Sequence, residues 1–303
     1  MTRYVIKRVL LAIVTVIALS MITFFAMNAI PGGPFNKEKA SSKEVQAMLE
    51  KRYNLDKPLG EQYILYMKGA LRGDWGISTK TGRDIGTTLF SSFKISARLG
   101  LTAAAVAIVC GLILGSIAAL NRNKLPDRLI IFFTTLATSM PSFVLASLLL
   151  LVFCVKLKWV PAWSAENNNI VLPIIALAAY PMAYITRLTK TSMLDSLSQD
   201  YVRTARAKGV PQLKVIFKHA LRNALIPVIT YVGPMIAYII TGSMVVENIF
   251  TIGGLGSKFV TGITNRDYPM IMATTLFLGT LMVSANLITD LVYKLVDPRI
   301  NLE

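Results

Sequence analysis

The sequence predicts an all-α integral membrane protein with six transmembrane helices, and three observations lead to this prediction. The first is composition: of 303 residues, 54% are hydrophobic and 16% are charged, with a mean hydropathy of +0.56. The second is a set of six long apolar runs, and the third is the placement of Lys and Arg between them. These features exclude a disordered chain and an ordinary soluble domain, in which about 25% of residues are charged.

The six apolar runs are long enough to cross a membrane. A hydrocarbon core about 30 Å thick requires about 20 apolar residues in a helix, and the runs contain 21, 22, 27, 17, 22 and 24 residues in order. The second and third contain no charged residue, although a soluble helix of that length would carry a polar face. The expected spans are Val9–Ala29, Leu99–Leu120, Leu129–Val155, Ile170–Thr186, Leu225–Val246 and Met270–Tyr293.

The N-terminal run resembles a signal peptide because Arg3, Lys7 and Arg8 precede it. The run is about twice as long as the apolar region of a signal peptide, and no clean cleavage site follows it. We therefore expect an uncleaved first membrane helix.

Lys and Arg are distributed unequally between the segments that join the spans. Four segments predicted to share one face hold 16 of the 32 Lys and Arg, whereas the two short segments on the other face hold 4. Positively charged loops stay on the cytoplasmic side, so both termini are predicted to be cytoplasmic. The net charge of +16 then needs no nucleic-acid partner. The four positive segments are 1–8, 121–128, 187–224 and 294–303.

Residues 30–98 form a long external segment after the first span. Helices are expected at Ser42–Tyr53 and Leu59–Leu71, and Gly73–Gly76 predicts a turn that holds Trp75 at the membrane surface. Because apolar and aromatic residues recur throughout, we expect an ordered cap.

The cytoplasmic segment 187–224 predicts two helices. In the first, Ser198 is the predicted N-cap and Gly209 the predicted C′ residue, with Pro211 beyond it. Tyr201, Val202 and Ala205 are expected on one side, and the small residues Ala205 and Ala207 would let another surface approach the backbone.

The second helix of this segment begins near Gln212 and is amphipathic. Lys214, Lys218 and Arg222 repeat on its polar side, as in a helix at a membrane surface. A helix joined to a span in this way suits the transfer of force from a cytosolic partner; a positive loop with snorkelling lysines is the alternative. The predicted apolar face is Leu213, Ile216, Phe217, Ala220, Leu221, Ala224 and Leu225.

The residues of this cytoplasmic segment resemble those of a known family. The run Asp200–Gly209, followed by His219–Pro227, resembles the cytoplasmic loop of peptide-type ABC importer permeases, the inner-membrane permeases of binding-protein-dependent transport systems. The whole chain is similar to the B-type membrane subunit of oligopeptide and dipeptide importers. Further matching segments are Ile30–Phe35, Tyr53–Pro58, Gly73–Gly76, Thr241–Glu247, Asn265–Tyr268 and Asp297–Ile300.

The chain departs from the broad importer signature at several positions. Arg203 and Thr204 replace the Glu and first Ala of its Glu-Ala-Ala, and Arg222 replaces its final Pro, which suits the peptide subgroup. Gly253 stands where the family usually has Pro. The segment Gly254–Lys258 fails the spacing of a phosphate-binding loop, so ATP must be hydrolysed by another chain.

The resemblance implies a type I ABC importer permease, a single domain over 1–303 in the bacterial cell membrane. It would pair with a second permease of C type, two cytosolic ATPases that use ATP and Mg, and an external peptide-binding protein. It would bind no cofactor, and its short cytoplasmic helix would dock on one ATPase. The coupling residues implied are Asp200, Tyr201, Arg203, Thr204, Ala205, Arg206, Ala207, Lys208, Gly209, Val210 and His219.

Polar residues within the spans are candidates for the translocation pathway, because a peptide backbone needs donors and acceptors. Helix–helix contacts would use the same residue types. Asp290 is expected to pair with Lys294 at the interface rather than to face the pathway. The pathway candidates are Ser142, Tyr231, Tyr238, Thr241, Ser243, Glu247 and Asn286.

Catalysis and metal binding have little support in the sequence. His219 is the only histidine and has no partner at a recognisable spacing, while Cys110 and Cys154 lie in apolar runs. We therefore expect a permease subunit that is not an enzyme. The alternatives are an ion-coupled secondary transporter, a passive channel, and an ABC importer permease for nickel or another small solute.

Overall fold

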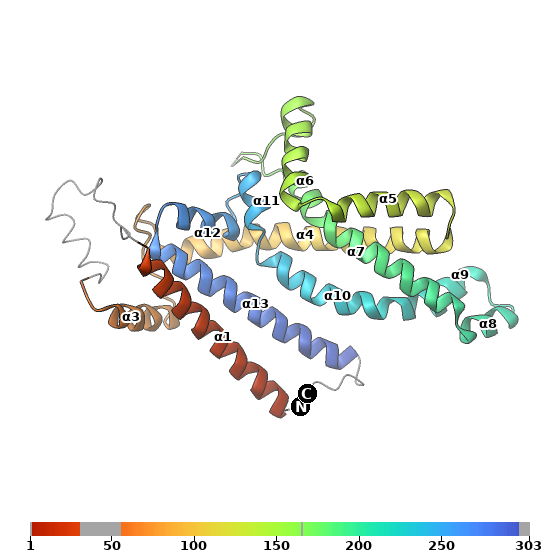
Figure 1. Ribbon diagram of the computed structural model, residues 1–303, viewed down its shortest axis with the longest axis horizontal. Helices are drawn as coiled ribbons and strands as arrows, with labels where there is room; N and C mark the ends of the chain where they lie inside the picture. The colour runs from red at the N-terminus through yellow and green to blue at the C-terminus, as the bar shows by residue number, and fades with distance from the viewer. Residues whose placement is uncertain (1, 31–55, 165, 297–303) are drawn as a thin grey trace. The chain divides into compact units, whose positions relative to one another are not determined.

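A computed structural model describes a chain whose regular elements are all helices within the described ranges (Figure 1). Two of them, η1 and η2, are π-helical. The structure describes residues 2–30, 56–164 and 166–296, with only the backbone for 2–4 and 290–296. The elements are α1 (Thr2–Ala29), α3 (Leu59–Leu71), α4 (Ile85–Leu120), α5 (Leu125–Ser139), α6 (Ser142–Leu149), η1 (Leu150–Lys156), α7 (Val171–Ser198), α8 (Asp200–Ala207), α9 (Gln212–Lys214), η2 (Val215–Leu221), α10 (Arg222–Ile240), α11 (Met244–Ile249), α12 (Leu255–Thr264) and α13 (Tyr268–Val296).

Five helical segments are long and apolar enough to cross a membrane, and a bent pair of helices raises the number to six. The bent pair corrects the third expected span: Leu125–Ser139 and Ser142–Lys156 meet at 105° instead of forming one helix. The bend arises at Pro141, which has no N–H to donate, and at Met140, whose backbone is extended. The five single segments are Val5–Ala29, Ile85–Leu120, Val171–Ser198, Gln212–Ile249 and Tyr268–Thr289.

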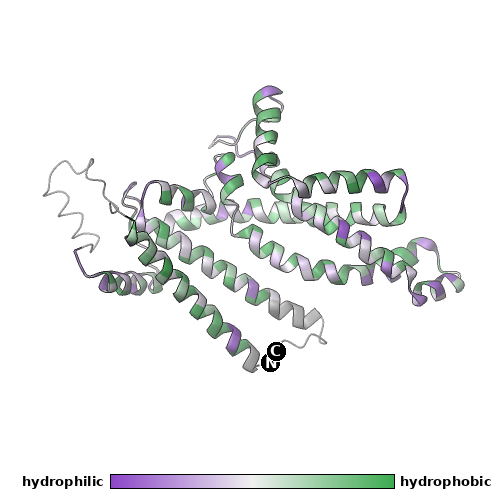
Figure 2. Ribbon diagram, viewed as in Figure 1, coloured by the Kyte–Doolittle hydropathy of each residue, from purple (hydrophilic) through white to green (hydrophobic). Residues whose placement is uncertain are grey.

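The chain divides into two compact units. Unit 1 comprises residues 1–95 and 253–303, and unit 2 comprises residues 96–252, so the boundary falls within α4. Figure 2 shows hydrophobic residues along the long helices and hydrophilic residues gathered on α8 and α9.

In unit 1, α1 packs along α13, and helix α3 is attached to α1. The hydroxyls of Ser20 and Tyr63 are 2.7 Å apart, and Ser20 is fully buried. The expected helix Leu59–Leu71 is confirmed, whereas the expected helix Ser42–Tyr53 lies outside the described residues.

The expected turn at Gly73–Gly76 is confirmed by left-handed glycines at both of its ends, with φ of 82° and 78°. Trp75 packs against Phe277 of α13, in the core of unit 1. After this turn, Asp84 caps α4: its Oδ1 accepts hydrogen bonds from the backbone N–H and the hydroxyl of Thr87. These bonds lower the pKa of the Asp84 carboxyl.

The loop between α3 and α4 is held by a buried carboxylate directly before α13. Asp267 is 4% exposed and accepts hydrogen bonds from the Ser78 hydroxyl at 2.5 Å and from the Thr79 backbone N–H and hydroxyl, each at 3.1 Å. The carboxylate therefore ties the loop before α4 to α13 through three bonds.

In unit 2, small residues of α4 allow α7 and α10 to approach closely. A Cβ added to Gly100 would lie 2.6 Å from the carbonyl oxygen of Ile239 on α10. A Cβ on Gly111 would lie 2.7 Å from Ile185 of α7, and one on Gly115 would lie 2.6 Å from the carbonyl oxygen of Thr186. Such small residues let membrane helices pack backbone to backbone.

Candidate functional site

The first cytoplasmic helix predicted from the sequence is α8, which follows α7 after a single residue. Its N-cap is Gln199 rather than the expected Ser198. The hydroxyl of Ser198 instead donates to the carbonyl oxygen of Asp195 at 2.7 Å, within the last turn of α7. The long helix α7 therefore extends to Ser198, well past the expected end of the fourth span at Thr186, and leads directly into α8.

The C-terminus of α8 is a complete Schellman motif, as the sequence predicted at Gly209. Gly209 has a left-handed φ of 74°, its N–H donates to the carbonyl oxygen of Arg206 at 2.9 Å, and the N–H of Val210 donates to that of Ala205 at 3.2 Å. Val210 also packs in the same apolar cluster as Ala205. These contacts end the helix at a defined residue.

One side of α8 is anchored in an apolar cluster. Val202 and Val215 are 0% and 1% exposed, and Leu197 of α7 packs against them. Ala205 is 7% exposed and belongs to the same cluster, which corrects the expectation that it would be open to another surface. Tyr201, expected on the same side as Val202 and Ala205, is 40% exposed. The helix is thus held by α7 and η2.

The other side of α8 is exposed and mainly cationic. Arg203 and Asp200 form an exposed ion pair with an Nη1–Oδ1 distance of 3.3 Å, worth little to stability. His219 lies half-buried on η2. The exposed candidates are Asp200, Tyr201, Arg203, Thr204, Arg206, Ala207, Lys208 and Gly209.

The second amphipathic helix is interrupted by the π-helical segment η2, which alters its predicted apolar face. Ile216 and Ala220 are buried as expected, but Leu213 and Phe217 are 70% and 63% exposed. Val215, absent from the predicted set, is buried in their place. A π-helical turn adds a residue per turn, so the strict 3.6-residue period used for the prediction does not hold across it.

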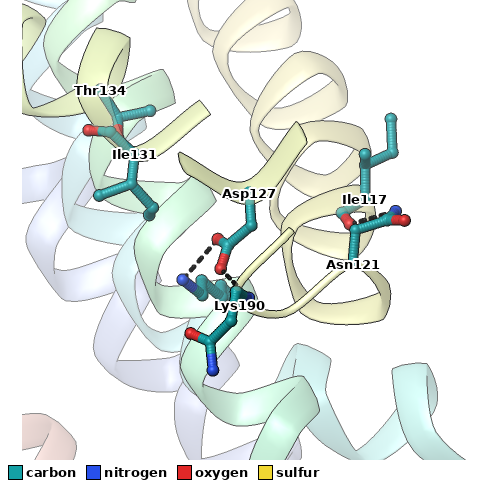
Figure 3. A network of polar contacts seen from close by, with 7 residues as sticks. Ile117, Asn121, Asp127, Ile131, Thr134 and Lys190 are labelled. Atoms are coloured by element: carbon teal, nitrogen blue, oxygen red, sulfur yellow. Dashed lines mark hydrogen bonds and ion pairs between the residues drawn. The ribbon is translucent and has the colours of Figure 1, made fainter. Parts of the chain in front are cut away.

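The second half of α7 is fastened to α5 by contacts that the sequence analysis missed. Lys190 Nζ lies 2.5 Å from Asp127 Oδ1, and the Asp127 side chain is 5% exposed (Figure 3). The other carboxylate oxygen accepts from the backbone N–H of Asn123 at 2.9 Å. Arg187, one turn before Lys190, donates to the carbonyl oxygen of Thr134 at 3.1 Å. No local sequence pattern pairs residues so far apart.

Glu247, expected at the end of the fifth span, is fully buried beside α4. Its Oε1 accepts a hydrogen bond of 2.7 Å from the hydroxyl of Ser96. A Cβ at Gly242, whose φ is 92°, would lie 2.7 Å from the same oxygen. Ser243 caps α11 by accepting from the N–H of Val246 at 3.2 Å. Helix α10 thus ends at Ile240, and a capped turn of helix follows it within the same candidate span.

The remaining pathway candidates are dispersed. Ser142 begins α6 and is exposed, Tyr238 of α10 is 70% exposed, and the Thr241 hydroxyl donates to the carbonyl oxygen of Tyr238 at 2.7 Å. Asn286 is exposed on α13 in unit 1. The expected pair of Asp290 and Lys294 falls outside the described side chains.

Tyr231 is the pathway candidate that other aromatic residues accompany. Its ring lies 4.3 Å, centroid to centroid, from that of Tyr184 on α7. Tyr184 and Tyr180 were absent from the candidates drawn from the sequence, although their spacing of four residues was the available signal. Within the described residues, no three His, Cys, Asp or Glu side chains come together as metal ligands would.

Comparison with known proteins assigns this arrangement to one family. The family described as the binding-protein-dependent transport system inner membrane component matches residues 111–302, and the N-terminal component of the same systems matches residues 1–94.

Two curated relatives align over nearly all of both chains. The dipeptide transport system permease protein DppB of Bacillus subtilis is 47% identical and covers 100% of this chain and 99% of its own. The oligopeptide transport system permease protein OppB of Haemophilus influenzae is 41% identical over 99% of each chain. A crystal structure of an amino acid ABC transporter with histidines shares the fold, with a TM-score of 0.54, 17% identity and coverage of 69% of this chain and 94% of its own.

Proposed function

The chain belongs to the binding-protein-dependent transport system inner membrane permeases, and from this premise we propose that it forms half of the translocation pathway of an ATP-driven oligopeptide importer. As a permease of an ABC importer, it is a multi-pass protein of the bacterial cell membrane. The observation that supports peptides as the substrate is the full-length similarity to permeases named for dipeptide and oligopeptide transport.

In this proposal α8 is the coupling helix that docks on a cytosolic ATPase. Three features support the role: its defined end at Gly209, its exposed cationic side, and its apolar attachment to α7 and η2. A helix of 8 residues is too short to be stable alone and needs such attachments. Force applied to α8 would therefore be passed to the helices that hold it.

We infer that α7 transmits this force into the membrane. It joins α8 through Gln199 alone, and its residues Arg187 and Lys190 fasten it to α5. Movement of α8 would then carry α5 with α7, so that the pathway opens to alternate sides of the membrane.

The proposed assembly contains a C-type permease, two ATPases that use ATP and Mg, and an external binding protein. Counting the bent pair as one span gives six spans, which would place both termini on the same side of the membrane. We assign that side to the cytoplasm because of the excess of Lys and Arg in the segments that share it. The polar candidates of α6, α10, α11 and α13, from Ser142 to Asn286, would contribute to the pathway. Glu247 would act there indirectly, since it is buried against Ser96.

The test is uptake of a labelled peptide by proteoliposomes that contain the complete importer. We expect uptake to require ATP on the side of the membrane where the ATPases are bound. We expect it to continue when an ionophore removes the proton gradient. Uptake that continues without ATP and stops with the ionophore would establish an ion-coupled transporter instead. Uptake of nickel with no uptake of peptide would establish the small-solute alternative.

A further inference from the structure

Three tyrosines of unit 2 gather on the surface formed by α7 and α10. Tyr180 and Tyr184 are four residues apart on α7 and so lie on the same side of that helix. The ring of Tyr184 is tilted by 33° against that of Tyr231 of α10, at 4.3 Å between centroids. The three form one cluster, which we call the tyrosine cluster.

The hydroxyls of the tyrosine cluster are available for a ligand. Tyr180 and Tyr184 are 54% and 43% exposed, and Tyr231 is half-buried. Within the described residues, none of the three hydroxyls has a hydrogen-bond partner. Each can donate one hydrogen bond and accept others, so the cluster offers unused capacity of both kinds.

Tyr180 lies near the middle of the apolar part of α7 rather than at either end of it. Helices rise about 1.5 Å per residue, which places Tyr180 about 14 Å from the start of α7 and near the middle of a core about 30 Å thick. Tyrosines that face lipid concentrate at the membrane surface, where the hydroxyl reaches water. An unpaired hydroxyl facing hydrocarbon at mid-depth is unfavourable, so the surface needs a polar occupant.

The nearest formal charge on α7 is Arg187, three residues after Tyr184, and its guanidinium already donates to the carbonyl oxygen of Thr134 and to the hydroxyl of Thr138. No Asp, Glu, Lys or Arg occurs between residues 171 and 186 of α7 or between residues 223 and 246 around α10. Since Arg187 is engaged with α5, a charged peptide side chain meets no unengaged fixed charge from these segments. The groups of a peptide that match this surface are the backbone N–H and C=O, which every peptide shares.

We propose that Tyr180, Tyr184 and Tyr231 form a contact site for the backbone of a peptide in transit, independent of its side chains. This inference rests on the proposed function. The phenol hydroxyls bind backbone N–H and C=O groups, and the ring faces give apolar contact without strict direction. The site thereby replaces some of the hydrogen bonds to water that the peptide backbone loses inside the membrane, whatever the peptide sequence.

The test combines a change in the protein with a matched change in the peptide. The protein change is Tyr184→Phe with Tyr231→Phe, which removes two hydroxyls and keeps both rings. The peptide change is methylation of the internal amide nitrogens of tetra-alanine, which removes the backbone donors. Transport is measured as uptake per ATP hydrolysed by the complete importer in proteoliposomes, so that unequal reconstitution does not affect the comparison.

We expect the double variant to transport unmodified tetra-alanine about 5- to 100-fold less efficiently, the loss expected for two net hydrogen bonds. The loss should be below about twofold for the methylated peptide, because two changes that remove the same contact are not additive. Contacts with the binding protein cancel, since they are the same for wild type and variant. In the double variant, transport of peptides with Glu or Lys at the second position should fall by the same factor as transport of tetra-alanine.

Tyr268→Phe is the matched control, because its hydroxyl is buried in unit 1 without a partner within the described residues. We expect no loss of transport in this variant. Equal losses for the methylated and unmethylated peptides, or a loss that follows peptide charge, would overturn the proposal. So would reduced co-purification of the second permease with the double variant, which would assign the cluster to a subunit contact. If wild type imports no peptide at all, the proposed function fails; if the variant equals wild type, this inference alone fails.

Discussion

Replacing Gly209 tests whether the defined end of α8 is needed for coupling. Gly209 occupies the left-handed region, with φ of 74°, and its N–H closes the last turn of the helix. A Cβ built there meets no atom within 4 Å. The substitution Gly209→Ala therefore introduces backbone strain and no steric clash.

The size of the effect follows from this backbone conformation. A left-handed residue with a Cβ costs about 1–2 kcal/mol relative to glycine. That energy lowers the ratio of ordered to frayed helix ends by a factor of about 5–30. We expect ATP-driven peptide uptake to fall by up to this factor, while the amount of protein in the membrane stays the same.

Three further variants separate backbone strain from other causes. Gly209→Asn should lose less activity than Gly209→Ala, because Asn tolerates the left-handed region. Gly209→Asp has the same shape as Asn but places a negative charge at a helix C-terminus, where the helix dipole disfavours it. Gly60→Ala, in the exposed first turn of α3 and with no atom within 4 Å of its Cβ, should have wild-type activity.

The assay is uptake by the reconstituted importer together with co-purification of the ATPases. We expect uptake to decrease in the order Gly, Asn, Ala, with Asp below Asn, and ATPase association to weaken in parallel. Wild-type uptake and ATPase association in both Gly209→Ala and Gly209→Asp would refute the role of this helix end. Equal losses for Asn and Ala would refute the backbone explanation.

Three predictions concern stability and are checked by thermal unfolding of the purified complex in detergent. Lys190→Met should destabilise by about 3–5 kcal/mol because it leaves the buried Asp127 carboxylate unpaired, and adding Asp127→Asn should recover part of the loss. Gly115→Val should destabilise by about 1–3 kcal/mol, since its side chain would overlap the backbone of α7; unchanged unfolding would contradict the close packing. Asp267→Asn should lower the free energy of unfolding by about 1–3 kcal/mol. Ser78 and Thr79 donate to different oxygens of the carboxylate, and an amide offers only one acceptor oxygen. An unchanged midpoint of thermal unfolding would show that these hydrogen bonds do not stabilise the fold.

Features that depend on neighbouring residues in the chain were predicted correctly. The membrane class, the external helix Leu59–Leu71 and the end of α8 at Gly209 all follow from hydrophobic runs or from start and stop signals within a few residues. The N-cap of α8 was misplaced by one residue, because Ser198 satisfies the end of α7 instead. Local signals locate an element well but not its terminal residue.

The tertiary structure alone decided which distant residues meet. Asp127 pairs with Lys190 and Glu247 with Ser96 because packing of α5 on α7, and of the chain after α10 on α4, brings them together. The same holds for the tyrosine cluster, whose members are up to 51 residues apart in the sequence. Periodicity determines which side of a helix is apolar, but the partner of each polar side chain depends on how helices pack, and that is a property of the whole fold.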